Sequence, residues 1–242
     1  MRGEVSTIRR TRVPGRLNKN TPGIPADIVV FHGGFLSDAM RDESDSRSRL
    51  DAVELPTNMA DILGEVRPTS DQPSTLADVV DPAGEWLPPG RSLSLSAMYQ
   101  DEDTRHAVHL EDSVEHVPCI LDALIVSLVT PDDPVRIEST SPVDDAVVEY
   151  RISDDVVDVA PEGAVISFGI APEDANGIQY GDDFEDDARI GSCSYINSFA
   201  DERTYEQWAD ETDAAAVMKL SVDAAAAVAR RLATSELFET ER

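Results

Sequence analysis

Alternating apolar and polar positions dominate the chain from residue 92 onward. Side chains of one character recur at every second position over short segments, which is the period of a strand with one buried face. Acidic or proline-containing segments of a few residues separate them, as turns between successive strands do. The pattern predicts strands at residues 93–97, 107–110, 135–139, 147–152, 156–159, 164–170 and 216–222, with further alternation at 189–199 and a short apolar run at 28–31.

Helical patterns lie among and around these strands. An apolar run begins at Pro118, and proline is favoured at the first helical position because its missing N–H would have no partner there. Thr57 is a candidate N-cap, and Trp208 is expected to pack its helix onto the core. Helices are predicted at residues 57–66, 75–80, 118–129, 204–212 and 222–238. The combined pattern predicts an α+β fold with a mixed, largely antiparallel sheet flanked by helices, and a poorly defined helical region before it.

Charge separates the head of the chain from the rest. Residues 1–20 carry six basic side chains and one acid, a charge of +5, while residues 21–242 carry −33, which together give the total of −28. We therefore expect residues 1–45 to be a basic, disordered extension. Met40, where the acidic character begins, is a candidate start of translation.

Composition suggests two further regions. Prolines punctuate residues 46–90, which predicts a small helical and loop-rich N-terminal region, and residues 91–242 form the main domain. The charged, serine-rich residues 41–50 predict a linker, and the acidic residues 171–188 predict a solvated loop.

The overall acidity narrows the choice of partners. A net charge of −28 repels nucleic acid and anionic membranes, so neither is expected as a partner. Adaptation of the surface to high salt is the simplest source of the charge, which predicts a halophilic source. No apolar run has the length of a membrane span, and two cysteines in 242 residues do not make a disulfide scaffold. We therefore expect a cytoplasmic protein.

The candidate chemistry lies at the start of the helix predicted at 118–129. Cys119 is expected in its first turn, where the helix dipole favours the thiolate. Asp122 is three residues on and so shares a face with Cys119, and its apolar neighbours favour the protonated carboxyl. The simpler interpretation is a small buried thiol and an aspartate that caps the helix.

Two segments of the chain resemble the organomercurial lyase (alkylmercury lyase) family. Cys119-Ile120-Leu121-Asp122, within residues 105–130, is similar to the family's first active-site motif. Residues 192–200 (SCSYINSFA) are similar to its second cysteine and the strand that follows it, and the similarity continues through Trp208. It covers about residues 92–235 and implies the alkylmercury-lyase fold for the main domain.

The resemblance implies that Cys119, Asp122 and Cys193 form the catalytic trio and also hold the mercury. Protonolysis of the carbon–mercury bond would release a hydrocarbon and leave Hg(II) on the two cysteines, with no separate cofactor. Soft Hg(II) prefers thiolates; Cys119 is expected as the first ligand, Cys193 as the second, and Asp122 as the proton relay. The substrate is a small organomercurial, and a mercuric reductase is the implied acceptor of the ion.

Departures and alternatives accompany this hypothesis. Ser141 stands near the position of a third, structural cysteine of the family, and the family's winged-helix-like N-terminal domain is not recognisable in residues 1–90. A non-catalytic Hg(II)- or soft-metal-binding protein, or a thiol sensor, on the same fold is the main alternative. A zinc site is disfavoured because His106, His109 and His116 lack ligand spacing.

Overall fold

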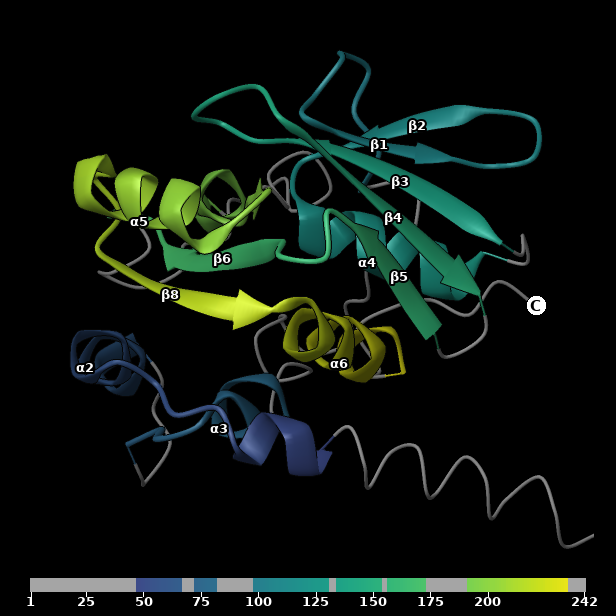
Figure 1. The fold of residues 1–242 in the computed structure, drawn as a ribbon. Helices are drawn as coiled ribbons and strands as arrows, with labels where there is room; N and C mark the ends of the chain where they lie inside the picture. Colours follow the sequence, from purple (N-terminus) through teal and green to yellow (C-terminus); the bar gives the residue numbers. More distant parts are fainter. Residues whose placement is uncertain are drawn as a thin grey trace, which may run out of the picture.

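The computed structural model describes residues 47–66, 72–81, 98–130, 134–153, 156–172 and 191–234. Helices and strands are interspersed along these ranges (Figure 1). The helices are α2 (Thr57–Val66), α3 (Leu76–Val80), α4 (Ile120–Val129), α5 (Glu202–Glu211) and α6 (Val222–Ala233), together with a helical turn at 47–51 and the 3-10 helix η4 (Gly191–Tyr195). The strands are β1 (His106–His109), β2 (Val114–Val117), β3 (Val135–Thr140), β4 (Val147–Ser153), β5 (Val156–Ala160), β6 (Val165–Ile170), β7 (Ser198–Phe199) and β8 (Ala216–Ser221).

The strands form two sheets, and every pairing among the described strands is antiparallel. The larger sheet has the order β2-β1-β3-β4-β5 and the smaller has the order β7-β6-β8. In β3, Val135, Ile137 and Ser139 are buried and alternate with partly exposed residues, as expected for a sheet with one face on the core. The α+β prediction is confirmed, with two antiparallel sheets in place of one mixed sheet.

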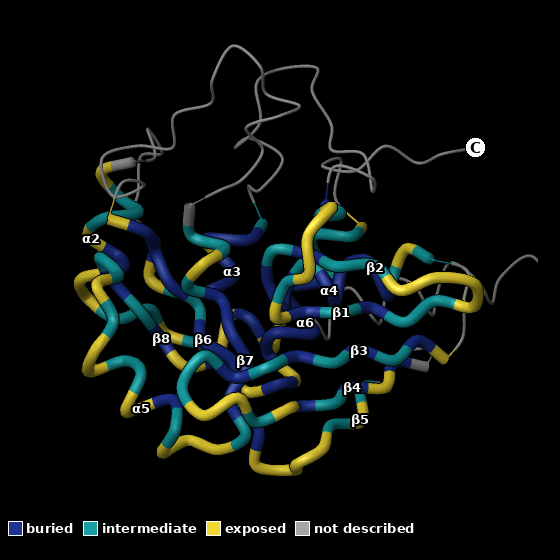
Figure 2. Tube along the Cα trace, turned by 90° about the horizontal axis from the view of Figure 1, so that it is seen from above, coloured by how far each residue is buried: buried dark blue, intermediate teal, exposed yellow. Residues whose placement is uncertain are grey.

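Helix α4 lies against the inner face of the larger sheet and beside α6 (Figure 1). Seven of its ten residues are buried, which explains why its sequence is apolar on all sides instead of amphipathic. Buried segments from both sheets converge on α4 and α6 (Figure 2). Tyr150 of β4 joins the two sheets, because its hydroxyl lies 2.8 Å from Ser198 Oγ in β7 and both side chains are buried.

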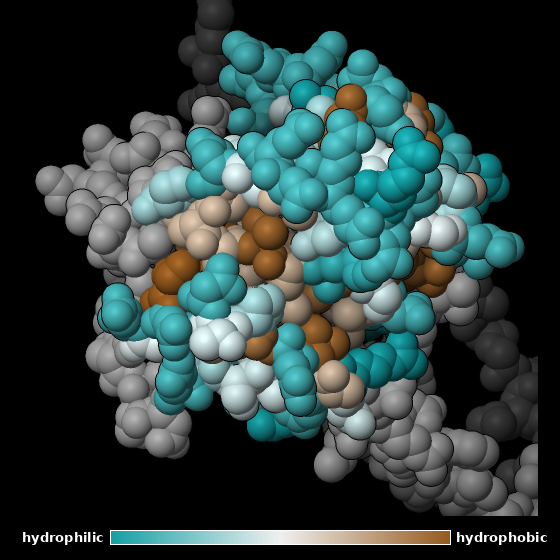
Figure 3. All heavy atoms as spheres, turned by 60° about the vertical axis from the view of Figure 1, so that its left-hand side comes forward, coloured by the Kyte–Doolittle hydropathy of each residue, from teal (hydrophilic) through white to brown (hydrophobic). Residues whose placement is uncertain are grey.

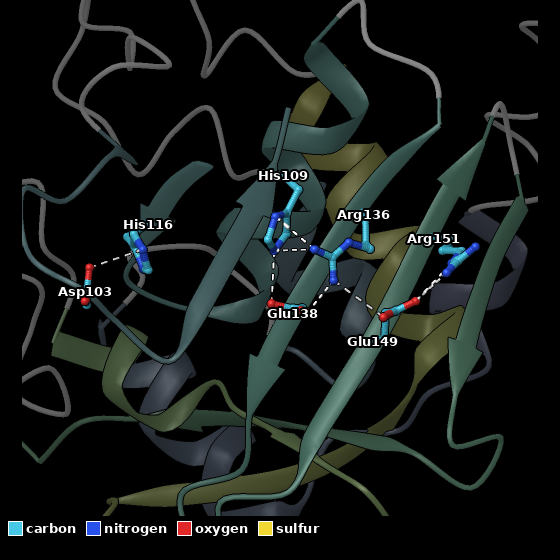
Figure 4. A network of polar contacts seen from close by, with 7 residues as sticks. All are labelled: Asp103, His109, His116, Arg136, Glu138, Glu149 and Arg151. Atoms are coloured by element: carbon cyan, nitrogen blue, oxygen red, sulfur yellow. Dashed lines mark hydrogen bonds and ion pairs between the residues drawn. The ribbon is translucent and has the colours of Figure 1, made fainter. Parts of the chain in front are cut away.

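The solvent face of the larger sheet carries a network of charged side chains (Figure 4). Arg136 forms ion pairs with Glu138 and Glu149 and lies 3.1 Å from His109 Nε2, while Arg151 pairs with Glu149 at 2.9 Å. Such ion pairs, within and between strands on an exposed face, each add little stability. On the face viewed in Figure 3, hydrophilic residues dominate the upper part and hydrophobic side chains form patches across the middle.

The described N-terminal residues pack onto the rest of the core. Leu50, in the turn at 47–51, is fully buried and belongs to the same apolar cluster as α4 and α6. Thr75 caps α3 through a capping box with Asp78, and Asp81 at the end of this helix accepts a 3.0 Å bond from Arg231 Nε of α6. The predicted linker at 41–50 is therefore wrong for its last four residues, because Leu50 is apolar and reaches the core.

Most predicted elements occur within one or two residues of their expected ends. Strand β2 was not predicted, because only Val114 and Val117 at its ends are apolar. The predicted start of α4 is wrong by two residues, since Cys119 is the N-cap and Pro118 precedes it. Thr57 is itself helical and so is not the cap of α2. The alternation at 189–199 corresponds mainly to η4, with only two residues in β7.

Other predictions concern residues outside the described ranges. The strands at 28–31 and 93–97, the basic extension and nearly all of the loop at 171–188 belong to this group, and the domain boundaries stay predictions. Within the part of the chain that the structure describes, none of the helices combines the length and apolar character needed to cross a bilayer.

Candidate active site

Cys119 stands at the junction between strand β2 and helix α4. Its backbone is extended, with φ −147° and ψ 166°, so it serves as the N-cap of the helix. The Sγ atom accepts a bond from the Asp122 N–H at 3.4 Å, the role a serine or aspartate oxygen usually has at this position. The side chain is only 1% exposed. The cap therefore fixes the thiol at the start of the helix, directed toward Asp122.

Asp122 receives bonds from both thiols. Its Oδ2 accepts from Cys119 Sγ at 3.1 Å and from Cys193 Sγ at 3.8 Å. The ligand atoms of these three residues all lie within 4.8 Å of one another, and they form the only such cluster of potential metal ligands among the described residues. The structure thus brings together the three residues that the sequence singled out, although Asp122 and Cys193 are 71 positions apart in the chain.

Cys193 reaches the cluster from η4, and backbone bonds tie this segment to α4. The Cys193 carbonyl accepts from Ile196 N–H at 3.2 Å, which closes the turn. The Ile196 carbonyl in turn accepts from Ile120 N–H at 3.4 Å, which satisfies one of the unpaired amides at the start of α4. The two cysteine-bearing segments are therefore in direct contact through their main chains.

Burial changes the proton affinities in the cluster. It raises the pKa of Asp122 from 3.8 to about 6, although the hydrogen bonds from the two thiols act in the opposite direction. The pKa of Cys119 is raised well above its ordinary value, mainly by burial and further by Cys193 and the Asp122 carboxylate. The expectation of an acidic Cys119 thiol is thus wrong, because desolvation outweighs the helix dipole.

The three groups differ in their access to solvent. Cys119 lies at the inner end of the cluster, whereas Asp122 and Cys193 are each partly exposed. Both cysteines are free thiols in the structure. A ligand that approaches from solvent would therefore meet Cys193 and Asp122 before Cys119.

The three histidines considered for zinc do not gather around these cysteines. Buried His106 bonds to Ser139 Oγ at 2.8 Å through Nδ1, and burial lowers its pKa to about 3, so it is neutral. His109 belongs to the charged network on the solvent face of the sheet. The ring of His116 pairs with Asp103 at 3.4 Å (Figure 4).

A family model for MerB, alkylmercury lyase, matches residues 100–234, more than half of the chain. The chain belongs to the alkylmercury lyase family. This confirms the predicted family, and the matched range lies within the predicted residues 92–235.

The chain is only distantly similar to individual proteins of known structure. Among solved structures, the mercury-bound form of MerB2 is similar at 17% identity with a TM-score of 0.42, over 55% of this chain and 59% of that chain. The similar part thus spans less than two thirds of the length of MerB2. No curated protein sequence matches the chain.

Proposed function

We propose that this member of the alkylmercury lyase family cleaves the carbon–mercury bond of small organomercurials by protonolysis. The observation that carries the proposal is the convergence of two free thiols and one carboxyl within 4.8 Å. Two thiolates match the preference of Hg(II) for soft ligands, and a carboxyl with a pKa of about 6 both accepts and donates a proton near neutral pH.

The reaction balances without any oxidant or reductant. The substrate is R–Hg–SR′, in which SR′ is a small thiolate from the medium. One cysteine displaces SR′, which leaves as the thiol HSR′ with one cysteine proton. The second cysteine then binds mercury, and its proton reaches carbon as the C–Hg bond breaks. The products are R–H, HSR′ and Hg(II) bound to two sulfurs, and mercury keeps its oxidation number.

The different solvent exposure of the two cysteines favours Cys193 as the first mercury ligand, in place of the expected Cys119. Cys193 is partly exposed and Cys119 is buried, so the displacement of SR′ occurs at Cys193. Cys119 has a raised pKa and keeps its proton until mercury is beside it. The metal then favours the thiolate, and the proton moves to Asp122 over the existing 3.1 Å hydrogen bond.

Asp122 is the proton relay in this proposal. The carboxylate takes the Cys119 proton and then donates it to the leaving carbon, and both acts need a group of intermediate proton affinity. Burial supplies that affinity by raising the pKa of Asp122 to about 6. A protein that only binds mercury needs the two thiols and has no use for this carboxyl.

The test is release of benzene from phenylmercury in the presence of excess small thiol. In its first turnover, wild-type protein should release one equivalent of benzene and hold Hg(II) until the excess thiol removes it, whereas Asp122→Ala should retain bound mercury and release no benzene. Cys119→Ser should still capture phenylmercury through Cys193, while Cys193→Ser should capture it slowly. Equal mercury binding by wild type and Asp122→Ala, with no benzene from either, would favour the non-catalytic binder. Transfer of the ion to a mercuric reductase stays a prediction.

A further inference from the structure

Strand β6 contacts the segment that carries Cys193 through Ser167 and Gly169, two positions on the same face of the strand. Neither position has any chemistry of its own to offer mercury, since one is a serine and the other a glycine. Both positions contact the segment that carries Cys193, so they bear on where Cys193 stands.

Ser167 is fully buried and bonds to this segment through both its side chain and its main chain. Its Oγ donates to the Tyr195 carbonyl at 2.9 Å and accepts from the Asn197 N–H at 2.9 Å. Its own N–H donates to the Asn197 carbonyl at 2.9 Å. One serine thus binds the chain on both sides of Ile196, the residue whose carbonyl bonds to the start of α4.

Gly169 allows the same segment to lie directly against β6. A Cβ atom at this position would lie 2.6 Å from Tyr195 Cβ, 3.1 Å from the Tyr195 carbonyl oxygen and 3.3 Å from Val217 Cγ1. Two of these three atoms belong to η4 and one to the neighbouring strand, so an added methyl group would force the turn outward.

We propose that Ser167 and Gly169 are positioning residues, which together hold the turn of Cys193 at the distance from Cys119 and Asp122 that lets both sulfurs bind one mercury atom. The part of this inference that concerns turnover rests on the proposed function. The part that concerns the shared mercury does not, because it requires only two converging thiols.

The experiment measures how well Hg(II) is retained against a competing monothiol, and the kcat and KM for benzene release. Gly169→Ala should retain Hg(II) only about as well as the one-thiol variant Cys193→Ser, and kcat should fall about 100-fold, as for a misplacement of about 1 Å. Ser167→Ala removes the side-chain bonds to Tyr195 and Asn197, and it should lower Hg(II) retention and kcat by about tenfold each. KM should change little, because capture uses a single thiol.

Matched controls separate position from stability. Gly163→Ala adds a methyl whose nearest neighbour would be the Ala200 carbonyl oxygen at an ordinary 3.7 Å. Ser127→Ala removes a buried hydroxyl that donates to the Leu124 carbonyl at 2.7 Å, away from η4. Both should match wild type in Hg(II) retention at a temperature where circular dichroism shows every variant folded.

A second substitution provides a rescue. Tyr195→Gly removes the Cβ that Gly169→Ala would meet, so the double variant should regain Hg(II) retention toward the level of Tyr195→Gly alone. If Gly169→Ala does not fold, the Hg(II) retention of Ser167→Ala and of the double variant tests the inference instead. Folded Ser167→Ala and Gly169→Ala proteins that hold Hg(II) as wild type does would overturn the inference. Retention of Hg(II) by wild type without benzene release would instead overturn the proposed function alone.

Discussion

Replacement of Asp122 by asparagine should make the protein more stable at alkaline pH. Burial raises the pKa of this carboxyl from 3.8 to about 6, so the folded protein favours the neutral form. The stability that the group contributes is therefore full below pH 3.8 and is lost as the pH rises through about 6. A difference of about two pKa units corresponds to at most about 3 kcal/mol.

Asparagine has nearly the same shape and no charge to bury. We expect the free energy of unfolding of Asp122→Asn to exceed that of wild type by up to about 3 kcal/mol at pH 8. The excess should shrink toward zero near pH 4, where the wild-type carboxyl is also neutral. Urea unfolding at both pH values, followed by circular dichroism, measures the difference.

Asp78 provides a control of opposite sign. Its carboxylate accepts bonds from the Ser74 and Thr75 amides, and these hold its pKa below the usual value. Asp78→Asn should therefore destabilise the protein at pH 8, and the loss should diminish as the pH falls through the folded-state pKa. If Asp122→Asn shows the same free-energy difference from wild type at pH 4 and pH 8, the reasoning about the buried carboxyl is refuted.

Three further predictions concern the rate and the core. The kcat/KM for benzene release should fall about tenfold per pH unit below pH 6, since protonated Asp122 cannot accept the thiol proton; a flat profile from pH 5 to 8 would contradict this. Tyr150→Phe should lower the free energy of unfolding by about 1–2 kcal/mol, because Ser198 loses its partner, while Hg(II) retention is unchanged. Phe199→Ala should lower the free energy of unfolding in urea by about 3–5 kcal/mol, since the ring is buried and its centroid lies 5.3 Å from that of Trp208.

The sequence was sufficient for the strands and for the apolar helix, because their burial patterns are local. Alternation in β3 reflects one buried face, and the mostly apolar run of α4 reflects burial on nearly all sides. Strand β2 was not predicted, because its middle residues, Glu115 and His116, are polar and partly exposed and give no alternation of apolar side chains.

The convergence of Cys119, Asp122 and Cys193 was expected from the resemblance, but the contacts of Ser167 and Gly169 with the turn of Cys193 were not. Nothing in the spacing of Ser167 or Gly169 reveals that they contact a turn 28 residues away. The acidity of Cys119 was predicted from its position at a helix start, but the sign of its pKa shift depends on how deeply β2 and α4 bury it. Local sequence specifies the helix cap, and tertiary packing determines the dielectric around it.

The most direct test of the central claim is the source of the hydrogen on the released hydrocarbon. Phenylmercury is incubated with the protein and excess small thiol in D2O, and the benzene is analysed by mass spectrometry while the mercury that remains on the protein is quantified. Protonolysis through Asp122 predicts, in the first turnover, monodeuterated benzene and one Hg(II) per protein, and it predicts no product from Asp122→Ala. Phenylmercury that stays intact on the thiols of the wild-type protein would contradict the account.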